Sequence, residues 1–182
     1  MASRDYPRRL IPDIPYGLVN GLMFNVTWFV IVLTESSAVA PVAALLHLAI
    51  HFWVVGRRIV EVKFVAQVAV FGLLVDQLLF WTGVFNLAGN PSLPPFWMFC
   101  IWPVLATTFM HAFSKLQQHL VLASIFGAIG GAASFIAGTR MTEVAFGFEP
   151  MGPIVVAAIW AMIFPLLLAI AGRRTPVKEA QL

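Results

Sequence analysis

The chain has 182 residues, of which 60% are hydrophobic and only 10% are charged, whereas soluble domains carry about 25% charged residues. Together with a mean hydropathy of +0.91, this composition excludes an ordinary soluble domain, and the continuous, non-alternating apolar runs exclude an outer-membrane β-barrel. The net charge of +3 does not predict nucleic-acid binding, because membrane topology accounts for the placement of the basic residues.

Six long apolar segments predict six membrane-spanning helices, because a helix of about 20 apolar residues crosses a bilayer. In chain order they are Gly17–Leu33, Ala38–Gly56, Phe64–Phe85, Phe96–Phe113, Leu120–Gly138 and Pro153–Gly172. The predicted fold class is therefore all-α, a polytopic transmembrane helical bundle. Residues 17–172 form its single domain, between a basic tail (1–16) and a second tail (173–182), both expected in the cytoplasm.

The basic residues predict the orientation of the bundle. With six crossings, ten of the eleven Lys and Arg residues fall on one side of the membrane, and only Arg140 falls on the other. The ten are Arg4, Arg8, Arg9, Arg57, Arg58, Lys63, Lys115, Arg173, Arg174 and Lys178. The positive-inside rule then predicts that both termini are cytoplasmic. A signal peptide cleaved after SSAVA is the alternative, but Pro41 would follow the cut, where proline generally blocks cleavage.

The fifth segment carries small residues at every fourth position on two faces. One face has Ala123, Gly127 and Gly131, and the other has Gly130, Ser134 and Gly138. Such faces let another helix backbone approach closely. We expect them to pack within the chain, and the alternative is an interface between two copies.

Polar side chains inside the predicted spans are the candidate functional groups, because burying them in lipid without partners costs free energy. Asp76, in the stretch LLVDQLLFW, is the best candidate for a catalytic residue. The helical rise places Asp76, Asn25, His47 and Thr107 at one level, roughly 12–16 Å from the outer ends of their spans. We therefore predict a buried network centred on Asp76, with His47 and Asn25 as its partners.

The full predicted network is Asn25, His47, His51, Asp76, Gln77, Thr107 and Thr108. The alternative is that Asp76 is a structural hydrogen-bonding group that locks the helices together. Recognised catalytic motifs are absent from the sequence, including the H-E-x-x-H zinc motif and the G-x-S-x-G nucleophile elbow. His47, His51 and Asp76 offer three ligands of types that bind metals, but the sequence predicts no metal and no cofactor.

Several of these residues, in order, resemble a family of uncharacterised small bacterial inner-membrane proteins, domain of unknown function 2878. The resemblance runs from Asn20 to Arg140 and departs from the family pattern at Asn25 and Ala132. The matching positions are Asn20, Phe24, Trp28, Asp76, Gly83–Phe85, Pro94–Met98, Trp102, Ala106–Thr108, Gly130, Gly131, Ser134, Gly138 and Arg140. The family tends to be encoded near enzymes of fatty-acid modification, which implies a link to membrane lipids by association.

Three functions fit these observations. The first is an enzyme or accessory protein of membrane-lipid modification, in which Arg140 contacts a lipid headgroup. The second is a small-molecule carrier or substrate-binding subunit of a transport system, with Gly17 and Gly21 facing a partner. The third is a structural partner in a membrane complex. The expected location is the bacterial inner membrane, and the expected partners are membrane lipids, other membrane proteins or further copies of the chain, with no nucleic acid.

Overall fold

The computed structural model of the chain describes residues 16–55, 59–89 and 93–174. Most of the two predicted tails lies outside the described residues, as do Arg4, Arg8, Arg9, Arg57, Arg58 and Lys178. Helices make up most of the described chain, which confirms the all-α class. The order is α1 (Tyr16–Thr34), α2 (Val39–Val55), α3 (Ile59–Trp81), β1 (Phe85–Asn86), α4 (Phe96–Phe99), α5 (Ile101–Ala106), the 3-10 helix η1 (Ser114–Gln118), α6 (Leu120–Met141), β2 (Ala145–Phe146) and α7 (Met151–Arg174).

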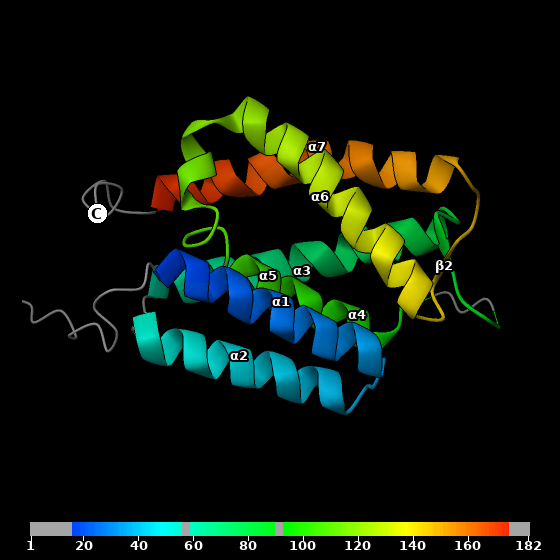
Figure 1. Ribbon diagram of the computed structural model, residues 1–182, viewed down its shortest axis with the longest axis horizontal. Helices are drawn as coiled ribbons and strands as arrows, with labels where there is room; N and C mark the ends of the chain where they lie inside the picture. The colour runs from blue at the N-terminus through cyan, green and yellow to red at the C-terminus, as the bar shows by residue number, and fades with distance from the viewer. Residues whose placement is uncertain (1–15, 56–58, 90–92, 175–182) are drawn as a thin grey trace, which may run out of the picture.

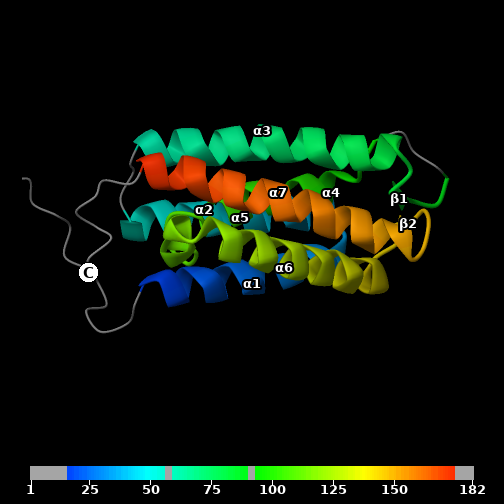
Figure 2. The same ribbon diagram turned by 90° about the horizontal axis from the view of Figure 1, so that it is seen from above.

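The long helices run along one common direction and alternate in sense, so that the start of α1 and the end of α7 lie at the same end of the bundle (Figure 1 and Figure 2). We call this end the N/C end. Within the described residues, α1, α3, α6 and α7 are long and apolar enough to cross a membrane, while α2 and the α4–α5 segment are shorter apolar helices. Large apolar side chains such as Val26 and Val121 are 65% and 79% exposed on the outside of the bundle. A helix that is apolar on its outer face as well as its inner face is typical of a membrane-embedded protein.

The fourth predicted span does not form as one continuous helix. Instead of Phe96–Phe113, the structure has α4 and α5, separated at Cys100, and then a series of turns from Thr107 onward. Pro103 causes part of this change, because it has no N–H to donate to the carbonyl one turn earlier. The hydroxyls of Thr107 and Thr108 bond the carbonyls of Val104 and Leu105 at 2.8 and 2.6 Å, which competes with the next helical turn.

The third helix begins five residues earlier than predicted. The sequence indicated a start at Phe64, with the charged residues before it in a loop. In the structure, α3 begins at Ile59 and takes Glu61 and Lys63 into its first turns. Glu61 is only 3% exposed, so the helix carries a carboxylate into the bundle near the N/C end.

The helices α6 and α7 form the closest helix pair, and small residues make this possible. A Cβ atom at Gly127 would lie 2.5 Å from Phe164 Cβ and 2.6 Å from the carbonyl oxygen of Trp160. A Cβ atom at Gly131 would overlap the Trp160 ring. Ser124 adds a hydrogen bond of 2.6 Å from its hydroxyl to the carbonyl of Ala161. The first small-residue face of α6 therefore packs within the chain.

Three contacts connect the far end of α6, or the segment that follows it, to the rest of the bundle. The strands β1 and β2 pair antiparallel, with Phe85 opposite Phe146, and Phe85 also stacks on Phe135 of α6 at 5.1 Å between ring centroids. The carboxylate of Glu35, after α1, accepts a hydrogen bond of 2.9 Å from the backbone N–H of Glu143, after α6. These contacts set the spacing between α1 and α6, which form the two sides of the cavity described next.

Candidate functional site

A cavity of about 500 Å³ lies between α1 and α6, with α4 and α5 at its base and α7 behind it. It extends along α1 from Gly21 to Val32 and along α6 from Phe126 to Thr139, which corresponds to roughly 16 and 20 Å of helix. Most of its lining is aromatic, aliphatic or glycine. The aromatic residues are Phe24, Trp28, Phe29, Phe85, Trp97, Trp102, Phe113, Phe126, Phe135, Trp160 and Phe164. Such a lining accepts an elongated apolar ligand.

The second small-residue face of α6 forms one wall of this cavity. A Cβ atom at Gly138 would meet nothing within 4 Å, and one at Gly130 would meet only the edge of Phe126 at 3.9 Å. Ser134 lies between them on the same wall. These three positions leave space for a ligand, whereas Gly127 and Gly131 are filled by α7.

Asp76 reaches this cavity from α3. Its Oδ2 atom accepts a hydrogen bond of 2.8 Å from the indole N–H of Trp102. Trp102 is held in place by stacking on Trp160, with 5.5 Å between ring centroids and 9° between planes, and by Gly72, where any Cβ would overlap the indole. The other carboxyl oxygen, Oδ1, has no hydrogen-bond partner among the described residues, although Asp76 is only 1% exposed. Asp76 thus lines the cavity and keeps one buried oxygen without a partner among the described residues.

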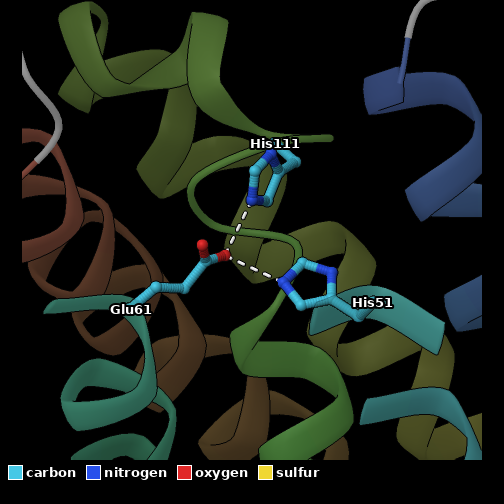
Figure 3. A group of neighbouring side chains, drawn as sticks. All are labelled: His51, Glu61 and His111. Atoms are coloured by element: carbon cyan, nitrogen blue, oxygen red, sulfur yellow. Dashed lines mark hydrogen bonds and ion pairs between the residues drawn. The ribbon is translucent and has the colours of Figure 1, made fainter. Parts of the chain in front are cut away.

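A second group of polar side chains lies between α1, α2, α3 and the segment after α5. We call it the polar cluster, and its members are Tyr16, Asn20, Thr27, His47, His51, Glu61, Thr107 and His111. At its centre, the Nε2 atoms of His51 and His111 lie 2.9 and 2.7 Å from the same oxygen of Glu61 (Figure 3). These three side chains come from three different parts of the fold and point toward one another.

The rest of the polar cluster forms a chain of hydrogen bonds that starts at His51. The Nδ1 atom of His51 lies 2.9 Å from the hydroxyl of Tyr16. Asn20 donates to Thr107 at 3.2 Å, and Thr107 also lies 3.1 Å from His47 Nε2. His47 Nδ1 lies 3.0 Å from the hydroxyl of Thr27. Buried networks of this kind join helices in a specific register, because each broken bond leaves a polar group unsatisfied.

The structure brings together only part of the network that the sequence predicted. His47, His51 and Thr107 do meet in the polar cluster. Asp76 makes no hydrogen bond with His47 or Asn25 within the described residues; its side-chain partner there is Trp102. Asn25 is exposed and donates to the carbonyl of Gly21 at 2.8 Å, although it lines the same cavity as Asp76.

Three further predicted residues lie apart from both groups or at their edges. Thr108 is buried and bonds only the backbone, through the carbonyl of Leu105. Gln77 is partly buried next to Asp76. Arg140 is exposed at the end of α6, between Thr139 and Thr142, which both line the cavity. Arg140 does not itself line the cavity, but its position in the chain is next to residues that do.

The sequence prediction missed Glu61 and the role of Trp102. Glu61 carried a detectable signal, because Glu61, Val65, Val68, Gly72 and Asp76 follow one another at intervals of three or four residues, and all are buried. Such spacing places residues on one face of a helix. The two carboxylates of α3 therefore share its inner face, and this was predictable once the helix was extended to Ile59.

The fold and its two groups of residues define a membrane-embedded α-helical protein with a lateral, largely apolar cavity and a separate polar cluster. Residues 17–166 match the family model described as protein of unknown function (DUF2878). The chain therefore belongs to this family. The match contains the whole cavity lining and every member of the polar cluster except Tyr16. No curated protein and no solved structure matches the chain.

Proposed function

We propose that this chain is a six-span protein of a bacterial inner membrane, with both termini in the cytoplasm, that binds one acyl chain of a membrane lipid in the cavity between α1 and α6. The observation that carries the proposal is the cavity itself, which is apolar, elongated and lined by one unpartnered carboxyl oxygen. Its length of roughly 16–20 Å is somewhat more than half of the ~30 Å hydrocarbon core of a bilayer, so it suits a chain from one leaflet.

Lateral entry from the bilayer is supported by the exposure of the cavity rim. Phe29 on α1 and Phe126 on α6 both line the cavity, and they are 47% and 46% exposed. A ligand that enters from lipid does not need to cross water. Arg140 lies at the end of the cavity where the headgroup of such a lipid would lie, and a guanidinium group is well suited to bind a phosphate.

Asp76 would make the cavity select among lipids. An oxygen that is buried without a partner costs free energy until a ligand supplies one, so it favours a ligand with a polar group along its chain, such as a hydroxyl. The protein would act on such a lipid, or present it to an enzyme that modifies it. Membrane-lipid modification is therefore the role that we propose for the cavity.

One surface suggested for the transport alternative is occupied within the chain. That alternative offered Gly17 and Gly21 as small residues that could face a partner protein. A Cβ atom at Gly17 would lie 3.1 Å from the carbonyl oxygen of His111, and one at Gly21 would lie 3.5 Å from Ala112 Cβ. Both glycines are used for packing inside the chain.

The test is the lipid that co-purifies with the protein in a mild detergent, measured by native mass spectrometry. The double variant Gly130→Leu/Gly138→Leu fills the cavity at positions where a Cβ meets no close neighbour, so it leaves the packing of α6 on α7 unchanged. Ala133→Leu is the matched control, because Ala133 is exposed on α6 and does not line the cavity. We expect the wild type and the control to carry lipid and the double variant to lose it; equal lipid in all three would overturn the proposal.

A further inference from the structure

The centre of the polar cluster has the composition of a metal site. His51, Glu61 and His111 each offer one ligand atom, and the three atoms lie within 4.8 Å of one another. They come from α2, from the first turn of α3 and from the turns after α5, so the folded chain is needed to bring them together (Figure 3). The sequence predicted no metal, and its only three-ligand set used Asp76, which lies at the cavity instead.

Two imidazoles and one carboxylate are a donor set that binds zinc and other divalent transition metals. Metal bonds of about 2.0–2.2 Å in a tetrahedral site separate neighbouring ligand atoms by roughly 3.3 Å. The two observed N···O distances of 2.9 and 2.7 Å are a few tenths of an ångström shorter than this. Small rotations of the side chains would therefore open the cluster enough to take an ion.

The surroundings of His51 orient its ring for this role. A histidine that binds metal through Nε2 keeps a proton on Nδ1, and this N–H needs an acceptor. Two groups lie beside Nδ1, the hydroxyl of Tyr16 at 2.9 Å and the amide nitrogen of Asn20 at 3.4 Å. The Asn20 amide can be turned so that its oxygen takes the place of the nitrogen.

Asn20 supplies a second, independent observation. Its side chain is 0% exposed, and its Oδ1 atom has no hydrogen-bond partner among the described residues. Turning the amide would place this oxygen beside His51 Nδ1, where it accepts the N–H that a metal-bound histidine carries. The turned amide gives up its bond of 3.2 Å to Thr107, so we expect the turn only in a state of the cluster in which His51 Nε2 faces an ion and Nδ1 carries the proton.

We propose that His51, Glu61 and His111 bind one divalent transition metal of the zinc type. Three protein ligands leave at least one coordination position open, which a water molecule would fill. The side chain of His111 is 17% exposed, whereas those of Glu61 and His51 are 4% and 0% exposed, so an ion enters from the side of His111. This proposal does not depend on lipid binding in the cavity, because no residue of the cavity is a ligand.

The experiment is a titration of the metal-free, full-length protein in detergent with Zn²⁺, followed by calorimetry, and with Co²⁺, followed by its visible absorption. We expect one equivalent of each ion to bind to the wild type. His111→Gln and Glu61→Gln should lose stoichiometric binding, and Tyr16→Phe should weaken it about 10-fold through the orientation of His51. His119→Gln is the matched control, because His119 is exposed and outside the cluster, and it should bind as the wild type does.

The variants must be folded for the comparison to count. Each is checked for a single symmetric peak in size exclusion, and His111→Gln decides alone if Glu61→Gln fails, because His111 is the most exposed ligand. A wild type without one-to-one binding would show that the cluster is only a group of hydrogen-bonded side chains. Binding that survives His111→Gln, or that is lost in His119→Gln, would equally overturn the proposal.

Discussion

The cavity and the polar cluster differ in how far their buried polar groups bond one another, although each contains one buried oxygen without a partner among the described residues, Asp76 Oδ1 and Asn20 Oδ1. In the polar cluster, Thr107 lies within hydrogen-bond distance of both Asn20 and His47, and Glu61 lies within that distance of two histidines. In the cavity, Asp76 has one oxygen bonded to Trp102 and one without a partner among the described residues. Polar groups that bond one another hold helices together, whereas an unpartnered group beside an empty volume is available to a ligand. The comparison therefore separates residues that stabilise the bundle from residues that line the cavity.

The same contrast exists within one helix. On α6, Gly127 and Gly131 are in contact with Phe164 and Trp160 of α7, while Gly130 and Gly138 have open space in front of them. Both pairs of glycines line the cavity, and Gly127 and Gly131 in addition pack closely against α7. The following predictions test these contrasts, in order of decreasing effect on stability.

The largest effect is expected for Gly131→Leu. The new side chain would overlap the Trp160 ring and separate α6 from α7, which should cost more than about 3 kcal/mol and prevent the protein from folding. Gly138→Leu adds the same side chain seven positions further along and should fold normally. Yield and peak shape in size exclusion check the pair. Equal behaviour of the two variants would remove the distinction between the two faces of α6.

A smaller loss of stability is expected for Glu61→Ala. The buried His51 and the partly exposed His111 would both lose their acceptor, at a total cost of about 1–3 kcal/mol, most of it from the buried ring. The exposed Glu149 is the control, and Glu149→Ala should change stability by less than about 0.5 kcal/mol. Unfolding by titration with sodium dodecyl sulfate in mixed micelles measures both. If Glu61→Ala unfolds at the same detergent concentration as the wild type, the cluster does not stabilise the bundle.

Trp102→Phe should reduce the free energy of unfolding by about 1–2 kcal/mol, which is less than the loss expected for Glu61→Ala. The reason is that the Asp76 carboxyl loses its hydrogen-bond donor. Trp81→Phe makes the same chemical change at a side chain that is 70% exposed, and we expect almost no effect there. The same unfolding titration applies. If both variants are equally stable, the hydrogen bond between Trp102 and Asp76 does not stabilise the bundle.

The smallest effect on stability is expected for Asp76→Asn, less than about 1 kcal/mol, because the amide oxygen can still accept from Trp102. Lipid binding should change instead, since the atom that faces the cavity becomes an amide. Lipid analysis of the purified variant beside the wild type checks this. A variant with normal stability and an unchanged lipid profile would assign Asp76 to structure alone.

The apolar runs predicted the class of the fold and most helix ends. The first, fifth and sixth spans were placed within about three residues of their observed ends, because long uninterrupted hydrophobic segments have few alternatives in a membrane. The fourth span failed because the effects of Pro103 and of two threonine hydroxyls depend on local hydrogen bonding, which hydrophobicity does not report. Glu61 was missed because a charge next to a basic loop resembles a loop residue.

The site was harder to predict than the fold, for a physical reason. The depth of Asp76, His47 and Thr107 can be counted along a helix, but the rotation of each helix about its own axis cannot. That rotation turns Asp76 toward Trp102 and His47 toward Thr27 and Thr107. The cavity was not predictable either, because Gly130 and Gly138 follow the same spacing as Gly127 and Gly131 and differ only in what faces them.

The most direct test of the central claim, that an acyl chain occupies the cavity, is quenching of tryptophan fluorescence by lipids with brominated acyl chains. The chain has six tryptophans, and replacing Trp53 and Trp81 by Phe removes two that are 73% and 70% exposed to the outside. The four that remain, Trp28, Trp97, Trp102 and Trp160, all line the cavity. We predict strong quenching in this background and markedly weaker quenching when Gly130 and Gly138 are also replaced by Leu. Equal quenching with the cavity open and filled would contradict the claim.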